Sequence, residues 1–176
     1  MAATQSTMLE LGTTAPHFAL DDTEGKFTCI DDFWADRALL VVFVSDRCPY
    51  VKHIAPALGE LAREYRPRGV AFVAINPNPD EGRPGDDTEP LRLPFPYLRD
   101  QAQSIARAYN AACTPDLYLF DEERQLVYRG EFDDSRPGNG VPVTGRALRA
   151  ALDAVLEGRE VPAEQTPSVG CGIRWV

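Results

Sequence analysis

The sequence predicts an α/β domain with a central mixed sheet, flanking helices and an N-terminal β-hairpin. Two short apolar runs, residues 39–44 and 70–75, enclose a segment with helical spacing, which is typical of parallel strands joined by a crossover helix. A hairpin pattern precedes this unit, and a second hairpin and a helical segment follow it. The length of 176 residues suits one domain with its own core.

The first half of the chain contains the hairpin and the start of the crossover. Residues 18–20 and 27–30 flank an acidic turn with a glycine, which predicts antiparallel pairing. The run at 39–44 is apolar throughout and rich in β-branched residues, as in a strand buried on both faces. Apolar residues then recur at helical spacing from Val51 until Pro67 ends the helix.

The second half continues the alternation of helices and strands. Residues 70–75 form the second parallel strand, and residues 101–109 have the pattern of a helix. The segments 116–120 and 126–130 predict an antiparallel hairpin, and residues 145–156 predict a closing amphipathic helix.

Three segments divide the chain. We expect residues 1–10 to be a flexible N-terminus and residues 11–157 to form the domain. Residues 158–176 are a tail broken by prolines and glycines. Because this tail ends in apolar residues that are costly to leave in water, we expect it to dock on the domain.

Charge and hydropathy limit the partners. A net charge of −9 repels nucleic-acid phosphates and anionic lipid surfaces. No apolar run approaches the roughly 20 residues that span a bilayer. Residues 1–7 are not basic and no apolar core follows them, so no secretory signal is expected. The sequence therefore predicts a cytoplasmic protein without nucleic-acid or membrane partners.

The 4 cysteines are spread widely along the chain, at Cys29, Cys48, Cys113 and Cys171. None of them forms the close pair that zinc ribbons and iron–sulfur sites use, so we expect neither a metal nor a cofactor. Cys29 is interpreted as a core residue, and His17 beside Pro16 as a residue that packs in a loop.

Cys48 is the predicted nucleophile. It follows a buried strand and precedes Pro49, which is favoured at the first position of a helix. The free N–H groups and the dipole at a helix N-terminus favour a thiolate, and open α/β sheets place their chemistry at the carboxyl ends of strands. Lys52, one turn further along, is placed to stabilise this thiolate, although a lysine on a helix most often lies on a solvated face.

Ser45 occupies the position three residues before Cys48, where dithiol redox motifs carry a second cysteine. A dithiol cycle within this motif is therefore impossible. The redox partner of Cys48 has to come from elsewhere in the fold, from another molecule or from a small thiol.

Several motifs carry a resemblance to a known family. They are GTTAPHF at 12–18, CPYVKHI at 48–54, CTPD at 113–116, FDDSRPGNG at 132–140 and the GC pair at 170–171. With these motifs the sequence resembles the alkyl hydroperoxide reductase and thiol-specific antioxidant group of thioredoxin-like redoxins, from about residue 11 to the end. The resemblance implies a thioredoxin-like fold and a thiol-dependent oxidoreductase that needs no cofactor.

The resemblance also implies substrate contacts. Thr114 and Pro115 match the position of the superfamily's cis-proline beside the active-site sulfur, where an extended disulfide substrate binds. With Pro49 and Arg47 they are the predicted substrate-binding residues.

Two cysteines are candidates for the second thiol. Cys113 lies next to the predicted cis bond and either resolves the oxidised Cys48 or is a buried small residue. Cys171 lies on a tail that could reach the site, although packing of the apolar end is the favoured interpretation.

Ser45 leaves two functions open. A hydroxyl three residues before the cysteine is similar to the peroxiredoxin pattern, in which it orients a peroxide, yet a serine here also serves as a helix cap or replaces a lost cysteine. Peroxiredoxins use a strand arginine near the position of Thr114 and Pro115, for which Arg47, Lys52 or Arg129 are the possible substitutes. The first hypothesis is an oxidoreductase in which Cys48 attacks a disulfide or a peroxide; its expected partners are a disulfide-containing protein, a low-molecular-weight thiol or a peroxide. The alternative is a non-catalytic binding or redox-sensing module.

Overall fold

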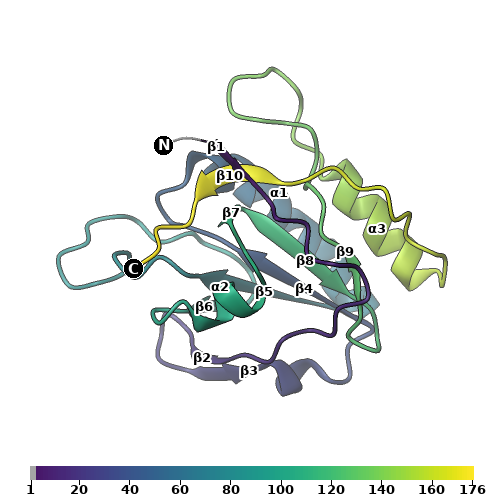
Figure 1. Cartoon of the computed structure of the whole chain (residues 1–176), viewed down its shortest axis with the longest axis horizontal. Coiled ribbons are helices and arrows are strands. Elements are labelled where there is room, and N and C mark those ends of the chain that lie inside the picture. Colours follow the sequence, from purple (N-terminus) through teal and green to yellow (C-terminus); the bar gives the residue numbers. More distant parts are fainter. Residues whose placement is uncertain (1–2) are drawn as a thin grey trace.

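A computed structural model describes residues 3–176, and its centre is a five-stranded mixed sheet (Figure 1). Strands β5 and β6 run parallel to β4, while β8 runs antiparallel to β4 and to β9. The strand order is β6 (Tyr97–Arg99), β5 (Val70–Asn76), β4 (Ala38–Phe43), β8 (Asp116–Phe120) and β9 (Leu126–Tyr128). The mixed sheet predicted from the sequence is confirmed.

Both faces of this sheet are covered. Helices α1 (Pro49–Tyr65) and α3 (Arg146–Leu156) contribute to the core on one face. Helix α2 (Ser104–Ala108) and residues beside the hairpin of β2 (Ala19–Asp21) and β3 (Phe27–Cys29) contribute to the core on the other. Since strand side chains alternate between faces, every residue of β4 is buried, as the apolar run predicts.

A second, small sheet joins the two ends of the chain. Strand β10 (Val169–Gly172) lies between β1 (Ala3–Gln5) and β7 (Cys113–Thr114), antiparallel to both (Figure 1). The tail that the sequence predicts to dock thus supplies a strand. The prediction of a flexible N-terminus at residues 1–10 needs correction, because residues 3–5 form strand β1 and pair with β10. Residues 1–2 lie outside the described part of the chain.

The remaining differences are local. Helix α2 begins later than the pattern at 101–109 predicts, because Gln103 adopts a left-handed conformation with φ 62°. Short 3-10 helices η1 (Ile30–Phe33) and η2 (Arg66–Arg68) follow β3 and α1, and a long loop occupies residues 77–96. Among residues 3–176, no helix is long and apolar enough to cross a membrane.

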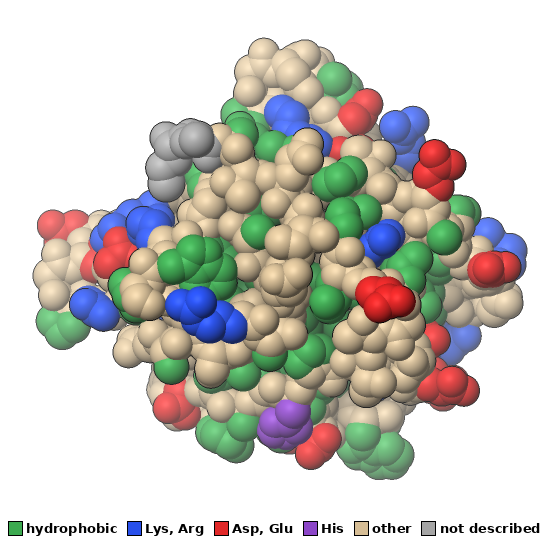
Figure 2. Space-filling model, viewed as in Figure 1, with side chains coloured by type: hydrophobic (Ala, Val, Ile, Leu, Met, Phe, Trp, Pro, Cys, Tyr) green, Lys and Arg blue, Asp and Glu red, His purple; other side chains and the backbone are tan. Residues whose placement is uncertain are grey.

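Charged side chains are distributed over the surface. On the face drawn in Figure 2, Lys and Arg side chains are interspersed with Asp and Glu side chains. Such a distribution offers no continuous basic surface on that face for a nucleic-acid backbone.

Candidate active site

Cys48 caps the N-terminus of α1 at the carboxyl end of β4. Its backbone is extended, Pro49 takes the first helical position, and the Lys52 amide donates to the Cys48 carbonyl at 3.0 Å. The sulfur is fully buried and lies 3.1 Å from the Thr114 carbonyl oxygen. The peptide bond between Thr114 and Pro115 is cis. The CTPD motif therefore lies directly against the thiol.

Cys171 is the thiol that the fold brings to Cys48. The two Sγ atoms are 3.0 Å apart, although 123 positions separate the residues in sequence. The pairing of Cys171 with Thr114 in the small sheet produces this contact, because Thr114 also faces the Cys48 sulfur. The interpretation of Cys171 as only a packing residue misses this contact.

Cys113 is the residue before Thr114, and its sulfur contacts backbone carbonyls. Its sulfur faces the Pro115 carbonyl at 3.7 Å and the Ser168 carbonyl at 4.0 Å. Of the two candidate second thiols, the geometry therefore favours Cys171 over Cys113.

The close approach of β10 depends on Gly170. A Cβ atom at this position would lie 1.8 Å from the Thr114 carbonyl oxygen, so only glycine fits without a backbone shift. The Ser168 hydroxyl donates to the Pro115 carbonyl at 2.6 Å. These contacts fix the tail on both sides of the cis peptide bond.

An ion-pair anchor holds the tail beyond Cys171. Arg174 donates to Glu81 at 2.5 Å and to Asp80 at 3.0 Å. The Arg174 amide also donates to the Asn78 side chain at 2.9 Å, and its carbonyl accepts from Gln103 at 2.8 Å. Sequence reasoning missed this anchor, because no local spacing relates residues 78–81 to Arg174.

Ser45 belongs to the same polar network. Its hydroxyl donates to Glu81 Oε2 at 2.6 Å, and the Asp46 amide donates to Oε1 at 2.5 Å. Burial opposes ionisation of Glu81, but hydrogen bonds from Ser45 and Arg174 outweigh it and lower its pKa. The hydroxyl that the sequence offers for peroxide chemistry thus stabilises a buried carboxylate.

None of the three cations proposed from the sequence contacts the Cys48 sulfur among the described contacts. Arg47 pairs with Asp80 at 2.8 Å and with Asp86 at 2.9 Å. Arg129 donates to the Leu9 carbonyl at 3.0 Å, and Lys52 is exposed on the outer face of α1. Arg47 therefore binds the 77–96 loop in the structure.

Burial raises the pKa values of two of the thiols and of a neighbouring carboxyl group. Burial, and then the hydrogen bond that the Cys171 thiol makes with the Cys48 sulfur, raise the pKa of Cys171 to about 12. Burial and the neighbouring Asp116 raise the pKa of Cys113 well above its ordinary value. Burial also raises the pKa of Asp116, to about 6. Cys171 therefore retains its proton at neutral pH in this closed arrangement.

One interpretation from the sequence needs refinement and another needs correction. Cys29 packs against the edge of the core, as predicted, but it is only half-buried because it ends strand β3. His17 is an exposed side chain whose Nε2 lies 3.3 Å from the Cys29 sulfur, so it does not pack in a loop.

Sequence comparison relates most of the chain to a redox family. Residues 11–129 match the AhpC/TSA family. A curated relative, the thiol-disulfide oxidoreductase ResA of Geobacillus thermodenitrificans, is 27% identical over 123 residues, or 70% of each chain.

Structural comparison supports a thioredoxin-like α/β fold. An uncharacterized conserved protein of Geobacillus kaustophilus has a TM-score of 0.93 at 50% identity, covering 100% of this chain and 97% of its own. The thioredoxin domain of a thiol-disulfide oxidoreductase of Bacteroides vulgatus has a TM-score of 0.60 at 16% identity, covering 82% of this chain and 99% of its own. At such low identity this second likeness concerns the fold alone.

Proposed function

Because the chain belongs to the AhpC/TSA family of thioredoxin-like redoxins, we propose that it is a thiol-disulfide oxidoreductase in which Cys48 attacks and Cys171 resolves. The observation that supports this proposal is the distance of 3.0 Å between the two Sγ atoms. A disulfide bond requires about 2.05 Å between sulfurs, so a shift of roughly 1 Å closes it.

The reaction runs in two exchange steps. The Cys48 thiolate attacks one sulfur of a substrate disulfide, forms a mixed disulfide and expels the other sulfur as a thiolate. Cys171 passes its proton to this leaving group and attacks the Cys48 sulfur, which closes the intramolecular disulfide and releases the second substrate thiol. Two electrons pass from the protein to the substrate, and an external thiol returns them.

The two thiols differ in their suitability for each step. Cys48 lies at the N-terminus of α1, directly before Pro49. Cys171 has a pKa raised to about 12, first by burial and then by the hydrogen bond that its own thiol makes with the Cys48 sulfur. Formation of the mixed disulfide removes that hydrogen bond, so Cys171 becomes a better nucleophile only after the first step.

Access to the sulfur requires movement of β10. Cys48 is 0% exposed and Cys171 is 4% exposed, so an external disulfide cannot reach either sulfur in the closed arrangement. Release of β10 from β7 uncovers Cys48 and frees the backbone edge at Thr114. An extended substrate segment can then pair with that edge.

A disulfide substrate agrees better with the site than a peroxide does. Peroxide chemistry needs a hydroxyl and a cation beside the sulfur, whereas Ser45 is bound to Glu81 and Arg47 to Asp80 and Asp86. Three points stay predictions from the sequence. They are the protein substrate, the low-molecular-weight thiol as reductant and the cytoplasmic location.

The first test maps disulfides after oxidation. The reduced protein is mixed with glutathione disulfide, quenched in acid and analysed by peptide mass spectrometry under non-reducing conditions. We expect a Cys48–Cys171 disulfide in the parent protein. Cys171→Ser should accumulate glutathione on Cys48, and Cys48→Ser should lose turnover.

Matched variants make the test specific. Cys113→Ser and Cys29→Ser should oxidise like the parent protein, because neither sulfur contacts Cys48 in the described residues. A Cys48–Cys113 disulfide, or full turnover by Cys48→Ser, would overturn the proposal. The same mapping after hydrogen peroxide tests the peroxide alternative.

A further inference from the structure

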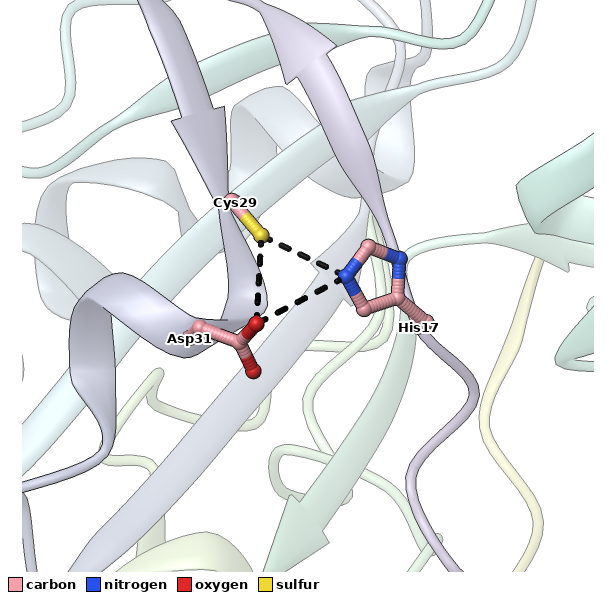
Figure 3. Close-up of side chains that lie close together, drawn as sticks. All are labelled: His17, Cys29 and Asp31. Carbon is pink, nitrogen blue, oxygen red and sulfur yellow. Dashed lines mark hydrogen bonds and ion pairs between the residues drawn. The ribbon is translucent and has the colours of Figure 1, made fainter.

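A second thiol site lies on the β2–β3 hairpin. His17 precedes β2, Cys29 ends β3, and Asp31 lies in η1. Cys29 pairs with Ala19 across the hairpin, so His17, two residues earlier, projects from the same face. Figure 3 shows the imidazole, the sulfur and the carboxylate turned toward one another.

The distances among the three donor atoms are nearly equal. His17 Nε2 lies 3.3 Å from Cys29 Sγ and 4.0 Å from Asp31 Oδ2, and the sulfur and the carboxylate oxygen are 3.9 Å apart. The distance of 4.0 Å between His17 Nε2 and Asp31 Oδ2 exceeds that of an ordinary N–H···O hydrogen bond, whereas 3.9 Å is within reach of a weak S–H···O hydrogen bond from Cys29. Zinc bonds of about 2.0 to 2.3 Å place the ligands of a tetrahedral ion about 3.3 to 3.8 Å apart. The donors therefore need only small shifts to share one ion.

The arrangement is not that of a catalytic triad. In a triad the histidine binds the nucleophile through one ring nitrogen and the carboxylate through the other. Here the same nitrogen, Nε2, faces both Cys29 and Asp31. Three donors that converge on one point are arranged as ligands around a cation.

Neighbouring contacts leave Asp31 available for the cluster. Asp32 accepts the Cys29 amide at 2.9 Å, so it supplies the local hydrogen bond that fixes the turn. The side chains of His17 and Asp31 are 62% and 85% exposed, so water can reach the point on which the donors converge. A site with three protein ligands and one water is typical of zinc sites that keep an open position.

We propose that His17, Cys29 and Asp31 form a surface site for Zn²⁺. A thiolate, an imidazole and a carboxylate together suit a borderline ion such as Zn²⁺, and not Mg²⁺ or Ca²⁺, which prefer oxygen ligands. Binding releases the Cys29 thiol proton to the solvent, because the thiolate is the ligand form. The site is independent of the Cys48 chemistry, since the hairpin lies far from β10 in Figure 1.

The test measures metal binding without the redox pair. In the Cys48→Ser/Cys171→Ser protein, Zn²⁺ is titrated in competition with a chromogenic chelator, and Co²⁺ is used to detect the charge-transfer absorption of a thiolate ligand. We expect one bound ion per chain and a thiolate–cobalt band. Added individually, Cys29→Ser, His17→Gln and Asp31→Asn should each weaken Zn²⁺ binding by roughly tenfold or more.

Neighbouring residues provide the controls. Asp32→Asn retains an acceptor for the Cys29 amide, and His53→Gln removes the other histidine, which contacts Ser135 at 2.7 Å. Both should bind Zn²⁺ like the Cys48→Ser/Cys171→Ser protein. Absence of a thiolate–cobalt band, or unchanged Zn²⁺ affinity in Cys29→Ser and His17→Gln, would overturn the site. Circular dichroism verifies that each variant is folded.

Discussion

Ser45 shows how one residue links the active-site turn to the distant tail. Its hydroxyl donates to Glu81, which also pairs with Arg174 of the C-terminal segment. Glu81 is fully buried, so each of these donors offsets part of the cost of burying its charge. The serine therefore contributes to the position of Cys171 without contacting the Cys48 sulfur among the described contacts.

Substitution of Ser45 separates a structural hydroxyl from a catalytic one. We expect Ser45→Ala to lower the free energy of unfolding by about 1 to 3 kcal/mol, because a hydrogen bond to a buried carboxylate is lost. Disulfide turnover should remain near that of the parent protein. Urea unfolding and glutathione disulfide reduction measure the two effects. Unchanged stability with a large loss of turnover would instead assign the hydroxyl to catalysis.

The buried carboxyl group of Asp116 makes the free energy of unfolding depend on pH. Burial raises its pKa to about 6, whereas an unfolded aspartate has a pKa of about 3.9. The folded state therefore favours the protonated form. The stability that the proton contributes is fully present below about pH 4 and is lost as the pH rises through about 6.

Asp116→Asn tests this dependence because its side chain does not titrate. Between about pH 7 and pH 5 the parent protein should gain roughly 1 kcal/mol of unfolding free energy relative to the variant. Chemical unfolding of both proteins at the two pH values measures the difference. Tyr118→Phe, which removes the hydroxyl 3.1 Å from Asp116 but retains the carboxylate, should keep the pH dependence. A constant difference between parent and Asp116→Asn would contradict the assignment.

The sequence identifies the nucleophile better than its partner. Cys48 is predicted by local signals, namely the apolar strand before it and Pro49 after it. Its contact with Cys171 depends on strand pairing over 123 positions, for which no local periodicity exists. The one sequence signal is the pair of glycines that flank Cys171, because glycine often marks a close backbone approach.

At the scale of elements, β10 is both a strand and a cover for the site. Its pairing with β7 places Cys171 opposite Thr114 and encloses the Cys48 sulfur. The sheet and its helices were predictable because their patterns extend over long segments. The small sheet was not, because β1, β7 and β10 are too short to show alternation.

Gly170→Ala should detach β10 from β7. The added Cβ would lie 1.8 Å from the Thr114 carbonyl oxygen. This oxygen belongs to the backbone, so it cannot rotate away as the end of a side chain can. We expect alkylation of Cys48 to accelerate roughly tenfold or more, a factor equal to about 1.4 kcal/mol, while the yield of the Cys48–Cys171 disulfide falls. Timed reaction with iodoacetamide and peptide mapping measure both changes.

Gly172→Ala is the matched control for this prediction. Its Cβ would lie 3.1 Å from the Thr4 side-chain oxygen, which can rotate away, so the strand should stay paired. Equal alkylation rates in the two variants would show that β10 does not control access to Cys48.

At the scale of the whole molecule, one network connects the long loop, the active-site turn and the C-terminal tail. Glu81 and Asp80 of the loop bind Arg174 of the tail, and Asp80 also binds Arg47, which directly precedes Cys48. Because hydrogen bonds lower the pKa of Glu81 despite its burial, the anchor stays charged at neutral pH. Opening of the tail therefore requires separation of Arg174 from these carboxylates.

Arg174→Ala should increase the fraction of molecules in which the tail is undocked. We expect a loss of roughly 2 to 3 kcal/mol of stability, at the lower end for a buried ion pair because Arg174 is partly exposed. Hydrogen exchange of the amides in β10 should accelerate, and Cys48 should react faster with iodoacetamide. Arg107→Ala is the control, since Arg107 stacks on Trp175 at 4.6 Å and does not contact Glu81 in the described contacts. If both variants exchange β10 amides at the same rate, docking of the tail depends on its apolar end and not on the anchor.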